Sequence, residues 1–458
     1  MNSIEKIEAL RKKQSSFFSS GKTKNIRFRK ESLRRLKNSI IKHDKEIRDA
    51  LHSDLNKSSF ETYATETGLV LNEINSHIRN ISKWAKPKTV WTPLFAMLSR
   101  SMIMPEPYGQ VLIISPWNFP FQLALIPLIG AVAAGNVAVI RQSRYSPNTN
   151  AIIRKILDES FTEDHVAVIN SDIETANAVI RLKWDLIFFT GSTKVGKLIY
   201  SEAALKLTPV ILELGGKNPV IAEEDVKIRV TARRIIWGKF TNAGQSCVAP
   251  DYLFVNEKVK GQLIAAMKEE IIKMFDASPS ENPDYPKIIS GTAFDRIAAR
   301  IENVKILYGG RCNKEKQSVE PTLIESQLND PIMQEEIFGP ILPVIGYNNL
   351  SEVIHYINSK GKPLAIYYFS ENRAKQRRVI SETSSGACLI NDVVIHFANK
   401  NLPFGGVGDS GTGRYHGKES FKAFSNRKAV MKTSRIIDVP LKYPPFKKKE
   451  QILRWFLR

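Results

Sequence analysis

The sequence predicts an α/β protein with a doubly wound parallel sheet, a second α/β domain and a small β element. Three observations in the 458-residue chain support this prediction. Short apolar runs alternate with amphipathic segments from about residue 111, and a second alternation of this kind begins after Gly216. Residues 188–196 have the pattern of a strand, a turn and the start of a helix. Continuous β-branched runs between helices are typical of strands that are buried on both faces of a parallel sheet.

The first unit is predicted to alternate strands and helices. The expected strands are residues 111–115, 137–140, 166–170 and 185–189. The apolar run at residues 119–140 is long enough to span a bilayer, but Pro120, Pro127 and Gly135 divide it. We therefore interpret it as a buried helix that stops at the glycine and is followed by a strand. A nucleotide site is expected at the carboxyl ends of these strands.

The second unit is predicted to begin with a strand around Ile221. A helix at residues 228–240, a strand at 252–255 and a long helix at 258–275 follow. Stretches rich in Pro, Asn and Asp at residues 278–286 and 313–321 are predicted to be loops within this unit.

Composition limits the class of protein and its compartment. With 43% hydrophobic and 25% charged residues, the chain is typical of soluble globular proteins. Its three cysteines have no metal-ligand spacing and cannot all pair, so we expect no metal site, no disulfide framework and a reducing, cytoplasmic compartment. The N-terminus lacks the apolar core of a secretory signal. The net charge of +21 suits an anionic partner, but no nucleic-acid-binding motif accompanies it, so no nucleic acid is expected.

Cys247 and the upstream Glu213 are the first candidates for chemistry. A thiolate can add to an aldehyde, release a hydride to a nicotinamide and remain as a thioester that an activated water hydrolyses. A single Cys is more often a small buried hydrophobic residue, so the pair alone does not decide the function. Residues 188–196 could present backbone N–H groups to a pyrophosphate, and Asn118 follows a predicted strand, where its amide could donate to an oxyanion.

These segments, taken in order, resemble the aldehyde dehydrogenase superfamily, and the details are similar to its class 3 branch. The resemblance covers nearly the whole chain. The class-specific likeness lies in residues 244–252 (GQSCVAPDY), 334–340 (QEEIFGP), 391–396 (NDVVIH) and 415–418 (YHGK).

The resemblance implies NAD(P)⁺-dependent oxidation of an aldehyde to its carboxylic acid, with medium- to long-chain aliphatic or aromatic substrates. Cys247 would be the nucleophile, Glu213 the base that activates the deacylating water, and Asn118 an oxyanion donor together with the Cys247 backbone N–H. Lys217 would have a structural role. The residues implied to bind a non-covalent cofactor are Trp117, Arg141, Arg144, Gly191, Ser192, Gly196, Leu214, Gly215, Glu336 and Phe338.

The chain departs from the family pattern after its second predicted strand. Where relatives have Lys-Pro-Ser-Glu, this chain has Arg141-Gln142-Ser143-Arg144. The acidic acceptor for a ribose 2′-OH is missing, and two guanidinium groups offer forked donors suited to a phosphate. One hypothesis is that NADP⁺ is accepted or preferred. The alternative is that Arg141 replaces the lysine, that Arg144 points into solvent, and that NAD⁺ binds more weakly.

The same resemblance divides the chain and implies a homodimer. The expected parts are a coenzyme-binding domain (1–88 and 108–213), a catalytic domain (214–408), a bridging element (89–107 and 424–439) and a basic amphipathic tail (440–458). The tail is too short to span a membrane. Its lysines, followed by apolar residues, would suit weak association with an anionic membrane surface, but the tail could equally pack on a partner subunit or cover the substrate entrance.

Two other functions stay open on the sequence alone. A coenzyme-A-acylating enzyme would release the thioester to a thiol, and Glu213 argues against it because hydrolysis is the step that needs this base. A catalytically weak relative, acting as a membrane-associated or structural protein, is favoured only by the altered segment at residues 141–144. The intact Cys247, Asn118, Glu213 and Glu336 argue against that function.

Overall fold

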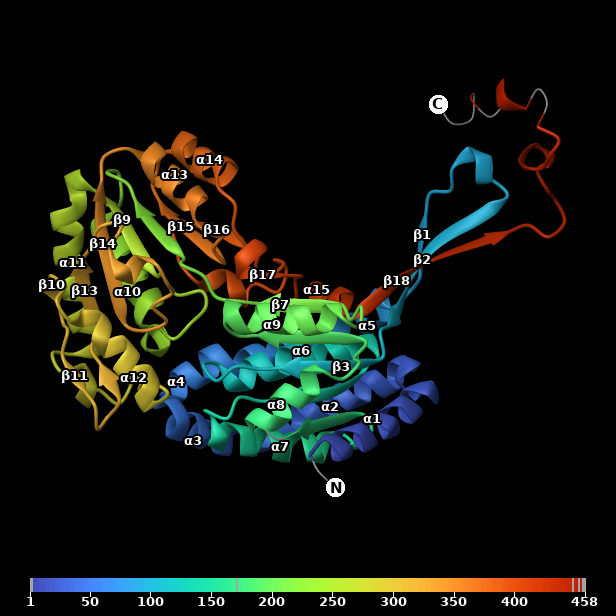
Figure 1. Ribbon diagram of the computed structural model, residues 1–458, viewed down its shortest axis with the longest axis horizontal. Helices are drawn as coiled ribbons and strands as arrows, with labels where there is room; N and C mark the ends of the chain where they lie inside the picture. Colours follow the sequence, from blue (N-terminus) through green and yellow to red (C-terminus); the bar gives the residue numbers. More distant parts are fainter. Residues whose placement is uncertain (1–2, 170–171, 447–448, 452–453, 455–458) are drawn as a thin grey trace.

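The computed structural model describes residues 3–169, 172–446, 449–451 and 454. Figure 1 shows two layered α/β units that form the body of the molecule and an arm of strands that projects from it. The fold class predicted from the sequence is confirmed, because both units contain mainly parallel sheets covered by helices.

The first sheet winds in both directions from its central strand. Its strands are β3 (Gln110–Ile114), β4 (Val137–Arg141), β5 (Val166–Ile169), β6 (Leu186–Thr190), β7 (Val210–Glu213) and β17 (Gly411–Thr412). Their order is β17-β7-β6-β3-β4-β5, in which β3 to β7 are parallel and β17 is antiparallel to β7. The direction of winding changes between β3 and β6, so the loops after these two strands border the crevice where ligands bind in such sheets.

Side chains that alternate along β3 enter two separate cores. Val111 and Ile113 belong to a cluster with helices on one face, whereas Leu112 and Ile114 belong to a cluster on the other. The first face carries α2 (Ile26–Lys42), α3 (Asp44–Leu55), α5 (Gly68–Trp84), α6 (Pro120–Ala134) and α7 (Pro147–Ser160). The second face carries α1 (Ser3–Ser19), α8 (Ile173–Ile180) and α9 (Thr193–Ala204).

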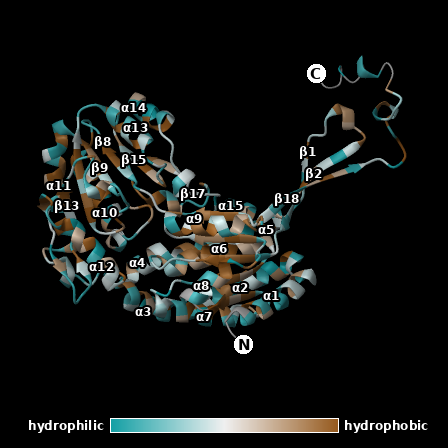
Figure 2. Ribbon diagram, in the orientation of Figure 1, coloured by the Kyte–Doolittle hydropathy of each residue, from teal (hydrophilic) through white to brown (hydrophobic). Residues whose placement is uncertain are grey.

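Helix α6 accounts for the long apolar run in the sequence. All of its residues are buried, and Figure 2 shows it as one of the most hydrophobic segments of the body. Gly135 ends the helix with φ 97°, a left-handed conformation that glycine adopts without strain. The interpretation as a buried core helix is therefore confirmed. No helix in the described part of the chain is long and apolar enough to cross a membrane.

The second sheet is also covered on both faces. Its strands are β8 (Pro219–Ala222), β9 (Tyr252–Asn256), β10 (Ile306–Tyr308), β13 (Thr322–Glu325), β14 (Ile341–Tyr347), β15 (Ala365–Phe369) and β16 (Ala387–Ile390). They lie in the order β10-β13-β14-β9-β8-β15-β16, and β10 is antiparallel to its neighbour. One face packs against α10 (Ile228–Phe240) and α11 (Glu257–Phe275), and the other against α12 (Gly291–Ala298), α13 (Leu350–Ser359) and α14 (Arg373–Glu382).

An antiparallel three-stranded sheet forms the arm. It contains β1 (Lys88–Val90), β2 (Ser99–Pro107) and β18 (Ser425–Thr433), with β2 in the centre. Most side chains of β18 are exposed. Helix α15 (Lys418–Ala423) precedes β18 and packs on α6, which anchors the arm to the first unit.

The predicted loop at residues 313–321 differs from the structure, because it includes most of a small hairpin. Strands β11 (Cys312–Asn313) and β12 (Ser318–Val319) pair there in antiparallel register. The Asn313 side chain accepts a hydrogen bond from the Lys316 N–H at 3.0 Å, and Gln317 has φ 50°. This side-chain turn reverses the chain tightly enough for two very short strands to pair.

Candidate active site

The loop that carries Cys247 has an unusual backbone. Asn242, Ala243 and Gly244 are successive residues with positive φ, at 53°, 50° and 72°. A Cβ on Gly244 would lie 2.3 Å from the Gly339 carbonyl oxygen, so the close approach of these two segments requires glycine. The turn follows α10 and leads directly to Cys247, which is a half-buried free thiol.

Asn118 lies beside this loop, although the two belong to different units. Its side-chain amide donates to the Gln245 carbonyl oxygen at 3.0 Å. Its own carbonyl oxygen accepts a hydrogen bond from the Asn242 side-chain amide at 2.9 Å. The structure thus brings the end of β3 and the Cys247 loop together through reciprocal hydrogen bonds between buried groups.

Burial sets the protonation state of Cys247 in the protein alone. Burial, reinforced by the negative charges of Glu336 and Glu213, raises the pKa of the Cys247 thiol to about 12. The Asn218 side-chain amide donates to the Cys247 carbonyl oxygen at 2.8 Å and fixes the backbone. The thiol is therefore held in place but protonated, and it needs a proton acceptor before it can act as a nucleophile.

Glu213 is the candidate for that acceptor. It ends β7, is 3% exposed, and neither carboxylate oxygen has a hydrogen-bond partner among the described residues. Burial raises the pKa of this carboxyl well above its ordinary value, and the positive charge of Arg414 opposes the rise. A Cβ on Gly405 would lie 2.8 Å from Glu213 Oε1, so a larger residue there would press on the carboxylate. A desolvated carboxylate of this kind is a strong base.

The predicted cofactor residues after β6 and β7 form one wall. Ser192 caps α9 by accepting a hydrogen bond from the Val195 N–H. A Cβ on Gly196 would lie 2.5 Å from Leu214, and a Cβ on Gly215 would lie 2.0 Å from Glu336 Oε2. Glycine at these positions allows close backbone approach, and the N-terminus of α9 provides free N–H groups for an anion. These features fit a dinucleotide.

Two aromatic residues from the two units are in contact. The ring centroids of Trp117, after β3, and Phe338 lie 5.4 Å apart at an interplanar angle of 82°. Glu336 precedes Phe338 and lies against Gly215. Burial, followed by the charge of Asp251, raises the pKa of the Glu336 carboxyl to about 8. The structure therefore gathers the predicted residues from 336 to 338 opposite those at 117 and 215.

The two arginines lie apart from this cluster. Arg141 ends β4, and Gly191 follows β6. Strand β3 lies between β4 and β6, so the loop with both arginines is two strands away from the loop with Gly191. The exposed Arg144 guanidinium lies 5.0 Å from the centre of the Tyr145 ring and donates to the Tyr145 hydroxyl at 3.1 Å. Burial lowers the pKa of Arg141, and the charge of Asp172 opposes this shift.

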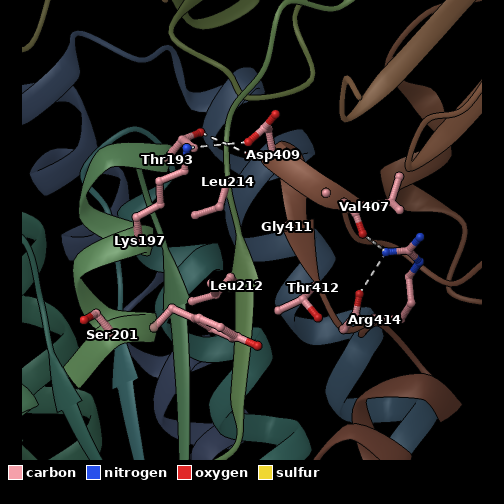
Figure 3. Close-up of a pocket in the computed structure, with 14 residues that line it drawn as sticks. Thr193, Lys197, Ser201, Leu212, Leu214, Val407, Asp409, Gly411, Thr412 and Arg414 are labelled. Carbon is pink, nitrogen blue, oxygen red and sulfur yellow. Dashed lines mark hydrogen bonds and ion pairs between the residues drawn. The ribbon is translucent and has the colours of Figure 1, made fainter. Parts of the chain in front are cut away.

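A cavity of about 810 Å³ is lined in part by Leu214, a residue of the predicted cofactor wall. Figure 3 shows it between α9, β7 and residues 406–414, where Thr193 and Lys197 both approach Asp409. The Thr193 hydroxyl donates to the Asp409 carbonyl oxygen at 3.2 Å, and Arg414 donates to the Gly406 carbonyl oxygen. The loop at residues 406–414 is thereby tied to the helix whose N-terminus forms the cofactor wall.

Several residues around the thiol were not singled out from the sequence. Asn242 and Gln245 lie within the segment that includes Cys247. In the structure Asn242 has positive φ and Gln245 bonds to three backbone groups. In the sequence, the Asn and Gly at positions 242 and 244 are the signal for a special turn, because both residue types favour positive φ. Lys57 and Glu66 belong to no motif. Lys217, expected to be structural, forms an ion pair with Asp251 and donates to two carbonyl oxygens.

A held thiol, a desolvated carboxylate and a glycine-lined wall at a sheet switch point define a thiol-dependent oxidoreductase of the nicotinamide-using class. Comparison with known families makes this specific. The model of the aldehyde dehydrogenase family matches residues 3–430, and the chain belongs to this family. It is an oxidoreductase that oxidises aldehydes to acids with non-covalently bound NAD(P)⁺.

The relatives that it resembles are family 3 members. The chain is 44% identical over 446 residues to the 4,4′-diaponeurosporen-aldehyde dehydrogenase of Staphylococcus aureus, covering 97% of both chains. It is 41% identical over 433 residues to aldehyde dehydrogenase family 3 member A2 of Pongo abelii, covering 93% of this chain and 89% of the relative. The predicted class 3 resemblance is confirmed.

Solved structures agree across the whole chain. The substrate-bound state of Staphylococcus aureus AldH superposes with a TM-score of 0.97 at 43% identity, covering 99% of both chains. A point mutant of betaine aldehyde dehydrogenase from the same organism, in complex with NAD⁺, gives a TM-score of 0.85 at 26% identity and covers 96% of this chain and 91% of that one.

Proposed function

We propose that Cys247, Asn118 and Glu213 carry out the oxidation. The observation that carries this proposal is the pair of hydrogen bonds that holds Asn118 on the Cys247 loop. The Cys247 thiolate adds to the aldehyde carbon, and the carbonyl oxygen becomes an oxyanion. One N–H of the Asn118 amide binds Gln245, and its second N–H serves this oxyanion together with the Cys247 backbone N–H. Such a donor contributes about 3 kcal/mol to lowering the barrier.

Glu213 accepts protons at two steps of the reaction. Its raised pKa makes it a suitable acceptor for the thiol proton and, later, for a proton of the water that attacks the thioester. Hydrolysis releases the acid and restores the thiol. Hydrolysis by a glutamate-activated water is what distinguishes this enzyme from one that transfers the acyl group to coenzyme A.

The cofactor would lie along the wall formed by the residues after β6 and β7 and beside the Trp117–Phe338 pair. Bound NAD(P)⁺ supplies the hydride acceptor. The α9 N-terminus, at Gly191 and Ser192, would bind the pyrophosphate, with Gly196 behind it. Glu336 would bind the nicotinamide ribose. Leu214, Gly215, Trp117 and Phe338 would border the ring. A test is the absorbance of reduced nicotinamide with a straight-chain aldehyde, where we expect turnover in the wild type and none in Cys247→Ala.

We further propose that NADP⁺ is accepted beside NAD⁺. Arg141 and Arg144 occupy the end of β4, where the relatives' acidic residue would meet the 2′-OH, and both guanidinium groups can donate to a phosphate. The proposal predicts that Arg144→Glu lowers kcat/KM for NADP⁺ at least tenfold and leaves the value for NAD⁺ within about twofold. A wild-type ratio that strongly favours NAD⁺ and is unchanged in Arg144→Glu would contradict it.

The proposed substrates are medium- to long-chain aliphatic or aromatic aldehydes, supported by the family 3 relatives. In this case KM should fall as the chain of a linear aldehyde lengthens, because each added methylene that is buried contributes about 0.8 kcal/mol. A constant KM from three to twelve carbons would argue for a polar substrate instead.

We propose a homodimer in which the arm and α9 contact a second copy. The arm stands away from the body, and α9 exposes Leu198 and Tyr200 beside the 810 Å³ cavity. Exposed apolar side chains of this kind are typical of interfaces. Sedimentation should give a particle of two chains, and Leu198→Asp/Tyr200→Asp should shift it toward one chain.

We also propose that the protein is cytoplasmic and associates weakly with anionic membrane surfaces through the end of the chain, from Ile436 through the tail. Ile436 is 95% exposed and Phe446 64% exposed, and Phe446 and Lys442 line one cavity. Lys447, Lys448 and the apolar residues Ile452, Leu453, Trp455, Phe456 and Leu457 lie outside the described residues. Co-sedimentation with anionic liposomes should exceed that of a form truncated after Phe446; equal values would contradict the proposal.

A further inference from the structure

Lys57 and Glu66 form an ion pair in the interior of the first unit. Lys57 Nζ lies 2.6 Å from Glu66 Oε1, and both side chains are fully buried. Removing two charges from water is costly, and apolar residues of similar volume are often as stabilising as a buried pair. The position of the pair beside the active site therefore matters more than its contribution to stability.

The lysine contacts the residue proposed as the oxyanion donor. Lys57 Nζ donates to the Asn118 carbonyl oxygen at 3.0 Å and lies 4.1 Å from the centre of the Phe119 ring. The same carbonyl oxygen accepts the Asn242 amide at 2.9 Å. Asn118 is thus held by one donor from its own unit and one from the Cys247 loop.

The glutamate holds the residues that follow Asn118. Glu66 Oε2 accepts hydrogen bonds from the Phe121 N–H at 3.1 Å and from the Gln122 N–H at 2.8 Å, in the first turn of α6. A negative charge is favourable at this positive end of a helix. The ion pair therefore fixes the segment from Asn118 to Gln122 at both ends.

An unusual backbone turn positions the Glu66 carboxylate. Glu66 lies in a π-helical turn, Tyr63–Thr67, between α4 (Ser59–Thr62) and α5. A Cβ on Gly68 would lie 2.6 Å from the Tyr63 carbonyl oxygen, so the turn requires glycine as it enters α5. Such turns are rare and occur frequently at functional sites.

We propose that Lys57 and Glu66 are positioning residues that orient Asn118 toward the substrate oxygen. This inference rests on the proposed role of Asn118. An oxyanion donor acts only within a narrow range of distances, and a misplacement of about 1 Å can cost about 10²-fold in rate. Neither residue touches the reacting atoms, so each acts through Asn118.

The test neutralises the pair without leaving one charge buried. Lys57→Met alone strands the Glu66 carboxylate and Glu66→Gln alone strands the Lys57 ammonium, so the principal variants neutralise both residues: Lys57→Met/Glu66→Gln and Lys57→Gln/Glu66→Gln, each of which keeps an acceptor for α6. The matched control is Lys316→Met/Glu281→Gln, an exposed Lys–Glu pair with the same 2.6 Å separation. We expect kcat to fall about tenfold or more in the principal variants, with the dissociation constant of NAD⁺ and KM for aldehyde within about twofold. The control should match the wild type.

Asn118→Ala separates the inference from the proposal on which it rests. Alone, it should lower kcat about 10²- to 10³-fold. Adding Lys57→Met/Glu66→Gln to it should lower kcat by less than about twofold more, because the pair acts through the deleted amide. An unaffected Asn118→Ala would refute the role of Asn118. A damaging Asn118→Ala with a fully active neutralised pair, or with additive losses, would refute the positioning role alone.

Discussion

The Cys247 thiol and the Glu213 carboxyl both have raised pKa values, but the reaction requires the thiol to lose a proton and the carboxylate to accept one. The Cys247 thiol must lose its proton, although burial raises its pKa to about 12. Glu213 must accept protons, and burial raises the pKa of its carboxyl as well. The same desolvation that restrains the nucleophile therefore strengthens the base. A bound cofactor or substrate that lowers the thiol pKa would allow the transfer between them.

Replacing this base should separate the two halves of the reaction. In Glu213→Gln we expect a slower burst of reduced nicotinamide, because the Cys247 thiol must lose its proton without this base. Steady-state turnover should fall further, about 10²-fold or more, because thioester hydrolysis also lacks its base. Rapid-mixing absorbance measurements would show both phases. Cys247→Ala, as a control, should show neither. Loss of the burst and of turnover to the same extent would place Glu213 in acylation only.

A buried histidine should make stability depend on pH. His165 packs among the rings of Phe17, Phe28 and Phe161, and burial lowers its pKa to about 4. The unfolded chain takes up the proton near pH 6.5 and the folded chain only near 4, so the contribution is complete above 6.5 and is lost as pH falls toward 4.

His165→Phe keeps a ring but removes the titration. The loss of unfolding free energy between pH 7 and pH 5 should then be smaller by about 2 kcal/mol, seen as a smaller shift of Tm in calorimetry. Equal shifts in both proteins would contradict a buried neutral histidine.

The sequence alone yields candidate residues where chemistry is concentrated in short segments. Cys247, Asn118 and Glu213 could be selected because each follows or lies in a distinctive run, and their roles remain proposals. Lys57 and Glu66 could not be selected, because their importance arises only when the end of α3 and the π-helical turn pack against α6.

At the scale of elements, the turn at residues 242–244 determines where the thiol lies. Gly244→Ala places a Cβ against Gly339 at a residue with φ 72°. We expect a loss of about 1–3 kcal/mol in stability and a fall in kcat of about tenfold or more, because the Gln245 carbonyl that holds Asn118 would shift. Thermal unfolding and steady-state kinetics would measure both.

The matched control is Gly261→Ala in α11, where a new Cβ meets nothing within 4 Å. It should leave kcat unchanged and raise stability by up to about 1 kcal/mol, since alanine favours the helix. A Gly244→Ala protein with wild-type Tm and kcat would show that the loop tolerates a side chain there.

Element prediction succeeded for long runs and failed for very short ones. Strands such as β3 and β9 each contain four consecutive apolar residues, and their burial is visible in the sequence. Strands β11, β12 and β17 contain two residues each. Two residues are too few for any periodicity, so such strands form only where the fold brings their partners together.

At the scale of the whole molecule, the two sheets share one apolar core. A single cluster contains Val111 and Phe121 of the first unit together with Val220 and Leu253 of the second. Phe424, far along the chain, stacks on Phe188 at 5.8 Å. The units are therefore joined by packing as well as by the chain.

This continuity predicts one cooperative unfolding transition in calorimetry, with activity and tertiary signals lost together. A fragment of residues 1–213 lacks β17, α15 and Phe424, and should unfold at a lower temperature than the full chain or fail to fold. Two resolved transitions in the intact protein would show that the units are energetically independent.

The reciprocal hydrogen bonds between Asn118 and the Cys247 loop also limit how the enzyme can exchange its cofactor. A hinge that swung the two units apart would break these bonds and expose the shared core. We therefore expect release of the reduced cofactor at each turnover to involve small loop movements more than a swing of the two units.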